Sequence, residues 1–171
     1  MQPLLGVRHH ESTNGARTRG GQAKAERMIK LLNEALATEI ICILRYKRHY
    51  FMTAGISSRR AKAKFLQHVA EEQAHAVQLA ERIVQLGGEL DLPAAELLNR
   101  NHAEHVEGDS VEEMITADLI AERIAIDSYR DMIASIDADD PTTRQVMERI
   151  LAQEEEHAEA LADLLRDCAS T

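Results

Sequence analysis

Two Glu-x-x-His pairs are the first groups in the sequence that could do chemistry: Glu72 with His75, and Glu154 with His157. A spacing of three residues keeps both side chains on one face of a helix. Carboxylates combined with imidazoles are ligands that iron and manganese accept, and the sequence has no cysteine cluster of the kind that structural zinc sites use. The spacing also arises by chance, so the place of each pair within its helix must decide between a metal site and a solvated acidic surface.

Both pairs lie in stripes of apolar residues that should form a core. At helical spacing, Phe65 and Leu79 flank the first pair, and Ile150 and Leu161 flank the second. A buried carboxylate is costly unless it is paired or bound to a cation. The position of the pairs therefore favours a metal site over a solvated surface.

Two further glutamates, Glu39 and Glu122, interrupt the apolar stripes of two other segments, and each is followed seven residues later by a tyrosine on the same face. Four such carboxylates would balance two divalent cations, and two neutral imidazoles would complete the ligands. The alternative is a buried salt-bridge network, but Arg45, Lys47 and Arg123 are expected to lie mostly off the stripes. The sequence therefore predicts a dinuclear metal centre with six ligands: Glu39, Glu72, His75, Glu122, Glu154 and His157.

Four more residues are expected around these ligands. Tyr46 and Tyr129 could hydrogen-bond ligands or donate electrons, although buried tyrosines with a bonded hydroxyl are also common in protein cores. Asp118, one turn before the glutamate of its helix, could orient a ligand imidazole or simply complement the helix dipole. His68 could contact iron, but a core histidine with satisfied nitrogens is the simpler interpretation.

Four long segments of helical periodicity must position these groups. The first runs from about Ala23 to Gly55, and the second from a cap at Ser57 or Ser58 to the glycines at 87 and 88. The short connection between them makes these two helices antiparallel neighbours.

The remaining two helices have clear start signals. Ser110 with Glu113 forms a capping-box sequence, and Asp140 followed by Pro141 is a typical cap and first turn. Residues 89–109 contain only a weak helical patch at 94–98, and such a long connection should cross the whole bundle. The predicted fold is all-α, an antiparallel four-helix bundle with a long crossover between the second and third helices.

The composition excludes several other classes. With 44% apolar and only 3% aromatic residues, three prolines and eight glycines, the chain is not typical of a β-sandwich or barrel. A net charge of −9 disfavours a general nucleic-acid binder, and no apolar run reaches the roughly 18 residues of a membrane span. We expect a cytoplasmic protein with a flexible, mildly basic tail at 1–22 and one bundle domain at 23–171. The tail could contact DNA phosphates, although a disordered terminus is the simpler interpretation.

Four stretches of the chain resemble the four helices of bacterioferritin and, more broadly, of ferritin-like iron-oxidising proteins, over roughly residues 25–167. They are "LATEIICILRYKRHY", "AEEQAHAVQLAERI", "VEEMITADLIAERI" and "ILAQEEEHAEAL". All six ligand positions of that family's dinuclear centre are matched. The resemblance implies a ferritin-like bundle with two iron ions per subunit. Glu72 and Glu154 would bridge the irons; Glu39 with His75 would complete one, and Glu122 with His157 the other.

The resemblance also implies an activity, namely oxidation of Fe(II) by dioxygen or hydrogen peroxide and storage or detoxification of the ferric product in a hollow homo-oligomer. Gln73 stands where bacterioferritin has its haem-ligating methionine, so no haem is expected. Little chain remains for the fifth helix of a 24-subunit shell, which favours a twelve-subunit, Dps-like cage. The alternative is a non-storage di-iron or di-manganese redox enzyme, of peroxidase or catalase type, on the same bundle.

Overall fold

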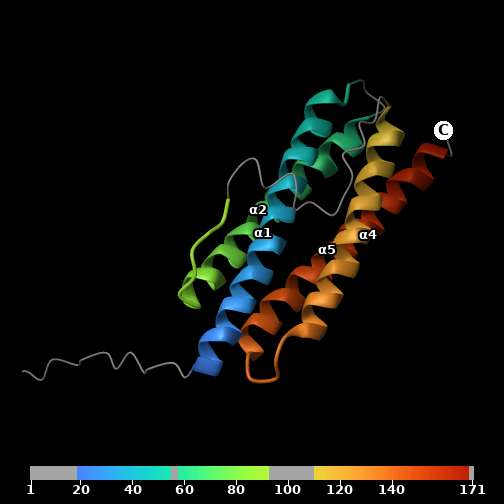
Figure 1. Ribbon diagram of the computed structural model, residues 1–171. Coiled ribbons are helices and arrows are strands. Elements are labelled where there is room, and N and C mark those ends of the chain that lie inside the picture. The colour runs from blue at the N-terminus through green and yellow to red at the C-terminus, as the bar shows by residue number, and fades with distance from the viewer. Residues whose placement is uncertain (1–18, 55–57, 93–109, 170–171) are drawn as a thin grey trace, which may run out of the picture.

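The computed structural model describes residues 19–54, 58–92 and 110–169, and the regular elements in this part of the chain are all α-helices (Figure 1). The all-α prediction is therefore confirmed. The helices are α1 (Arg19–Met52), α2 (Arg59–Gln85), α4 (Val111–Ser135) and α5 (Pro141–Ala169). Among the described residues, no helix combines the length and the apolar character needed to cross a membrane.

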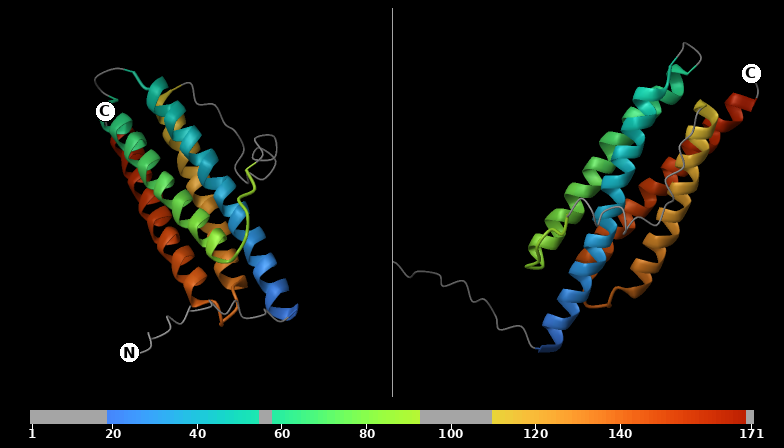
Figure 2. Two further views of the ribbon diagram at one scale, coloured as in Figure 1. Left: turned by 90° about the vertical axis from the view of Figure 1, so that its left-hand side faces the viewer. Right: turned by 45° about the horizontal axis from the view of Figure 1, so that its top comes forward.

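The four helices form an antiparallel bundle of two hairpins. α1 packs along α2, and α4 packs along α5; the hairpins meet where α1 faces α4 and α2 faces α5 (Figures 1 and 2). α2 ends and α4 begins at opposite ends of the bundle (Figure 1), as the predicted long crossover requires. The helical patch expected at 94–98 lies outside the described residues.

The predicted caps of α4 and α5 are confirmed. Ser110 Oγ accepts a hydrogen bond from the backbone N–H of Glu113 at 3.1 Å, and the Glu113 carboxylate accepts one from Ser110 N–H at 3.1 Å. Asp140 accepts from both the backbone N–H (3.1 Å) and the hydroxyl (2.6 Å) of Thr143. These bonds satisfy N–H groups that the first turn of each helix leaves without partners.

α1 begins at Arg19, four residues before the predicted Ala23. The first turns of α1 contact the turn between α4 and α5: Lys24 Nζ lies 3.1 Å from the Asp139 carboxylate, and Arg27 donates to the Ser135 carbonyl at 2.6 Å. The periodicity of apolar residues along the sequence gives no information about such tertiary contacts. The rest of the predicted tail, residues 1–18, lies outside the described residues.

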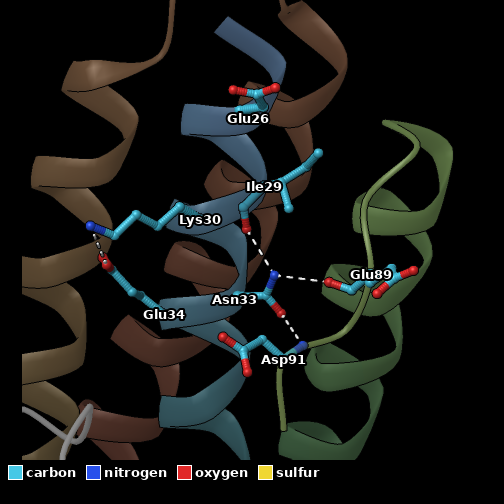
Figure 3. A pocket seen from close by; sticks show the side chains of 7 residues that line it. All are labelled: Glu26, Ile29, Lys30, Asn33, Glu34, Glu89 and Asp91. Carbon is cyan, nitrogen blue, oxygen red and sulfur yellow. Dashed lines mark hydrogen bonds and ion pairs between the residues drawn. The ribbon is translucent and has the colours of Figure 1, made fainter. Parts of the chain in front are cut away.

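Asn33 fastens the chain beyond α2 onto α1. Its amide nitrogen donates to the carbonyls of Ile29 and Glu89, both at 3.1 Å, and its oxygen accepts from Asp91 N–H at 2.9 Å (Figure 3). Gly87 supplies the positive φ of 80° that ends α2, a conformation that favours glycine. A surface cavity of about 470 Å³ lies beside Asn33, between α1 and the segment that follows α2.

The buried interior consists of two apolar clusters with a polar layer between them. The first cluster includes Leu36, Leu79 and Ile150, and the second includes Phe65 and Leu161. Along every helix, the chain passes from one cluster to the other through one or two buried glutamates or histidines. The polar residues therefore lie at one level of the bundle, enclosed at both ends by apolar side chains.

Candidate metal centre

The structure brings all six predicted ligands together in the polar layer. None of the six is more than 4% exposed. Their ligand atoms form two overlapping groups, each with all atoms within 4.8 Å of one another. One group is Glu39, Glu72, His75 and Glu154; the other is Glu72, Glu122, Glu154 and His157. Glu72 and Glu154 belong to both groups, as bridging carboxylates would.

His75 directs its Nδ1 at the first group. This nitrogen lies 2.9 Å from Glu154 Oε1, 3.2 Å from Glu39 Oε2 and 3.3 Å from Glu72 Oε2. The opposite nitrogen, Nε2, lies 3.0 Å from Gln153 Oε1 on α5. A partner on the outer nitrogen sets the orientation of the ring and leaves the inner nitrogen available to a metal.

His157 is arranged in the same way in the second group. Its Nδ1 lies 3.4 Å from Glu72 Oε1, 3.5 Å from Glu154 Oε2 and 3.8 Å from Glu122 Oε1. Its Nε2 contacts Glu71 Oε2 at 3.0 Å. Glu72 and Glu154 therefore turn one oxygen toward each imidazole, which divides the centre into two halves that share two carboxylates.

The charges of this layer are strongly coupled. Burial, and next the charge of Glu154, raise the pKa of Glu72 and of Glu122 well above the ordinary value. Burial alone would lower the pKa of His75 and His157, but hydrogen bonds with the carboxylates outweigh it and raise both. Burial would raise the pKa of Glu154, but hydrogen bonds from its neighbours outweigh it and lower it. In the metal-free protein, protons thus do part of the neutralising that cations would do.

Several buried atoms of the centre make no hydrogen bond of good geometry, although imidazole nitrogens or carboxylate oxygens lie close to them: both carboxylate oxygens of Glu72, Oε2 of Glu122, Oε1 of Glu154 and Nδ1 of His157. A buried polar atom without a partner costs about 1–3 kcal/mol. Five such atoms converging in one layer fit divalent cations, and the donor set of carboxylates and imidazoles suits iron or manganese.

The two predicted tyrosines hydrogen-bond ligand carboxylates. Tyr46 on α1 donates to Glu122 Oε1 on α4, and Tyr129 on α4 donates to Glu39 Oε1 on α1. Burial, and next the charge of the bonded glutamate, raise the pKa of each tyrosine hydroxyl well above its ordinary value. Both tyrosines therefore keep their protons and act as donors that hold one oxygen of the bonded carboxylate.

Asp118 contacts a different imidazole from the one expected. Its Oδ2 lies 2.8 Å from Nδ1 of His49 on α1, not beside a ligand histidine. Sequence reasoning missed His49, although its position three residues after Tyr46, on the same helical face, was a usable signal. Burial raises the pKa of Asp118, against the opposing effects of His49 and Arg45.

The prediction that Arg45 lies off the buried stripe is wrong, because this side chain is only 6% exposed. α1 packs against both α2 and α4, so its buried face is wider than one narrow stripe and includes Ile41, Cys42 and His49 as well. Glu71, which is not among the site residues predicted from the sequence, is only 30% exposed at its side chain and contacts His157. Gln153, which contacts His75, was not predicted from the sequence either.

Gln73, the residue on which the expected absence of haem rests, is exposed on α2. The absence of haem stays a prediction.

His68 lies beside the second group. Its side chain is 1% exposed, and its ring stacks on that of His157 with centroids 4.1 Å apart. Burial, and next the charge of His157, lower the pKa of His68 to about 3, so the ring is neutral near pH 7. Its Nδ1 lacks a hydrogen-bond partner. The simpler interpretation, a core histidine with satisfied nitrogens, therefore does not describe this atom.

Comparison with known proteins adds four similarities. The family model of ferritin-like domains matches residues 29–171. The chain is 34% identical to the bacterioferritin of Streptomyces coelicolor over 140 residues, which cover 78% of this chain and 77% of that protein. The fold is similar to the bacterioferritin-related protein of Bacteroides fragilis, a dodecameric thioferritin, with a TM-score of 0.80, 27% identity and coverage of 85% and 88%. It is also similar to a ferritin-like di-iron carboxylate protein of Bacillus anthracis, with a TM-score of 0.71, 27% identity and coverage of 83% and 97%.

Proposed function

The chain belongs to the family of ferritin-like domains, as the resemblance in its sequence predicted, and we propose that it oxidises Fe(II) at a dinuclear centre inside its four-helix bundle. The observation that carries the proposal is the division of the polar layer into two halves. Glu72 and Glu154 each turn one oxygen to His75 and the other to His157. That arrangement fits two metal ions bridged by two carboxylates.

Iron is the substrate of this reaction, two ions per chain. Glu39 and His75 hold one ion and Glu122 and His157 the other, with the two shared glutamates between them. Each Fe(II) gives one electron to the oxidant, which is dioxygen or hydrogen peroxide. With hydrogen peroxide, two Fe(II) and two protons yield two Fe(III) and two water molecules; with dioxygen, two electrons and two protons yield hydrogen peroxide.

The chain contributes positioning and charge. Binding of two cations displaces the protons that His75, His157 and the raised-pKa carboxyl groups hold in the metal-free protein. Tyr46 and Tyr129 each hold one oxygen of a terminal glutamate, so the other oxygen remains for the metal. The apolar clusters above and below the layer limit access of water to the centre.

We further propose that copies of the chain assemble into a hollow cage in which the ferric product is stored, with twelve subunits preferred over 24. The dodecameric protein of Bacteroides fragilis, similar over 85% of this chain, supports this number. α1 also carries large apolar side chains that a monomer would leave in water: Leu44 is 60% exposed, Phe51 76% and Met52 57%. Whether residues 1–22 contact DNA stays a separate prediction.

Iron capacity tests the storage proposal. The purified protein is loaded aerobically with excess Fe(II), and iron per chain is measured after removal of unbound metal. Tens of irons per chain, far more than the two that a dinuclear site holds, support a storage cage. A plateau at about two contradicts storage and favours the alternative, a di-iron or di-manganese enzyme of peroxidase or catalase type. The control is Glu154→Ala, which removes a bridging ligand and should abolish rapid oxidation during loading.

A further inference from the structure

The two halves of the centre are related by an internal repeat, and His68 breaks it. Glu72 and Glu154 occupy equivalent positions, each three residues before its histidine. Four residues before Glu154 stands Ile150, which is 0% exposed and belongs to an apolar cluster. Four residues before Glu72 stands His68, which is 1% exposed. One half of the centre is thus bordered by a hydrocarbon side chain and the other half by an imidazole.

A second break lies at the same end of the centre. Tyr46 and Tyr129 occupy equivalent positions in the repeat, because each follows a ligand glutamate by seven residues. The residues three positions further on, His49 and Met132, are therefore equivalent as well. His49 is paired with Asp118, whereas Met132 lies in the apolar cluster with Ile150. The second half, next to Glu122 and His157, therefore borders His68 and the His49–Asp118 pair, where the equivalent positions of the first half are Ile150 and Met132.

The geometry of His68 points into this second half. His68, Glu122 and His157 each offer a ligand atom, and these atoms lie within 4.8 Å of one another. Three buried atoms in this group have no hydrogen-bond partner: Nδ1 of His68, Oε2 of Glu122 and Nδ1 of His157. Two ligand atoms each about 2.1 Å from one ion lie up to about 4.2 Å apart. The rings of His68 and His157 are stacked, so the His68 side chain must rotate out of this stack, with a small contraction of the group, before the three residues can share a cation.

We propose that His68 is a further metal ligand in the second half of the centre and makes that half the tighter one for borderline divalent cations. The first half offers three carboxylates and one imidazole, and the second offers three carboxylates and two imidazoles. Additional nitrogen ligands favour ions such as Co(II) and Zn(II) over harder ions that prefer oxygen alone. This inference rests on the proposed dinuclear centre and adds to it an order of filling, with the second half first.

Co(II) alone is the probe for the test, added to the full-length, metal-free protein under anaerobic conditions. Isothermal titration follows the affinity of the two binding steps. NMR counts the exchangeable imidazole N–H signals that the paramagnetic ion shifts, one for each bound histidine. We expect three shifted signals in the unaltered protein and a first step tighter than the second. In His68→Leu we expect two signals and a first step weakened about 10–100-fold, the range for altered metal environments.

The control variant is Ile150→Leu, which changes a side chain at the equivalent position of the other half without adding or removing a ligand. It should keep three signals and both affinities. The number of shifted imidazole N–H signals is measured on the unaltered protein. The test therefore still decides the role of His68 if the His68→Leu protein folds poorly. Two signals with tight Co(II) binding contradict the role of His68 and leave the dinuclear centre standing. A protein that binds no Co(II) contradicts the centre itself.

Discussion

The hydroxyl of Tyr129 on α4 donates a hydrogen bond to Oε1 of Glu39 on α1. The reciprocal bond runs from Tyr46 on α1 to Glu122 on α4. Each tyrosine therefore holds the ligand glutamate of the opposite helix rather than the one seven residues before it. The pair of bonds ties α1 to α4 across the candidate metal centre, at the contact between the two hairpins.

Tyr129→Phe and Tyr46→Phe should each slow Fe(II) oxidation. Removal of a hydroxyl frees one oxygen of the bonded glutamate, and loss of such a supporting bond typically lowers metal affinity or activity about 10–100-fold. Initial rates of aerobic oxidation, measured over a range of Fe(II) concentrations, check this expectation. Tyr50→Phe is the matched control, because Tyr50 lies on α1 but outside the polar layer. Equal rates in all three variants would contradict the assigned role.

Glu154→Ala should abolish rapid Fe(II) oxidation and preserve the helices. Glu154 contributes one oxygen to each half of the centre, so its loss removes a ligand from both ions. Oxidation is followed by absorbance of the ferric product, and helix content by circular dichroism. Glu156→Ala is the matched control, since Glu156 is exposed on the same helix. Normal oxidation kinetics in a well-folded Glu154→Ala protein would contradict the assignment of the centre.

Metal binding should stabilise the protein, and more so as pH rises. Burial raises the pKa of Glu72 and Glu122, and carboxylates raise those of His75 and His157. A group with a raised folded-state pKa stabilises the fold fully below its unfolded-state pKa, and that stability is lost as pH rises through the folded-state value. The metal-free protein should therefore lose stability progressively as pH rises above the ordinary glutamate pKa of 4.5, whereas bound cations replace the lost protons.

Thermal unfolding with and without Co(II) at several pH values measures this effect. At a free Co(II) concentration of a hundred times Kd, the added stability is about 2.7 kcal/mol. A metal-induced shift in Tm that shrinks with rising pH would contradict the proton-for-metal exchange. Chelator at the same ionic strength provides the reference curve.

Asp140→Ala should destabilise the protein by about 1–2 kcal/mol through loss of the α5 cap. Asp140 accepts two hydrogen bonds from Thr143 and one from Arg82 at 2.8 Å. Burial alone would raise the pKa of Asp140, but these partners outweigh burial and lower it. The stabilisation of the fold by the Asp140 carboxylate is thus fully present above the ordinary pKa of 3.8, and it is lost as pH falls through the lowered folded-state pKa. Urea unfolding at neutral pH measures the loss of stability in Asp140→Ala. Asp139→Ala is the control, because Asp139 is the more exposed of the two residues.

Phe51→Glu combined with Leu44→Glu should break the assembly into smaller species. The two side chains are seven residues apart, on one exposed face of α1, and are 76% and 60% exposed. A charge placed in an apolar interface between copies cannot be solvated or paired there. Sedimentation velocity measures the result. Arg149→Glu, at an exposed position of α5, controls for the change in charge. An unaltered mass in the double variant would place the interface elsewhere.

The sequence by itself determined the six candidate ligands and most helix boundaries, because both are local, one-dimensional signals. Glu39 and Glu122 are conspicuous because they interrupt an apolar period, and a period is visible without knowledge of any partner. The caps at Ser110 and Asp140 depend on residues three positions away in the chain. Such signals need no information about how the helices pack.

Only the tertiary structure decided which side chains meet. Asp118 pairs with His49, 69 positions away, and His157 finds Glu71, 86 positions away. Each contact depends on how far one helix is rotated about its axis and shifted along its neighbour, and no local periodicity specifies either quantity. The burial of Arg45 has the same origin, because it requires α2 and α4 to cover two sides of α1.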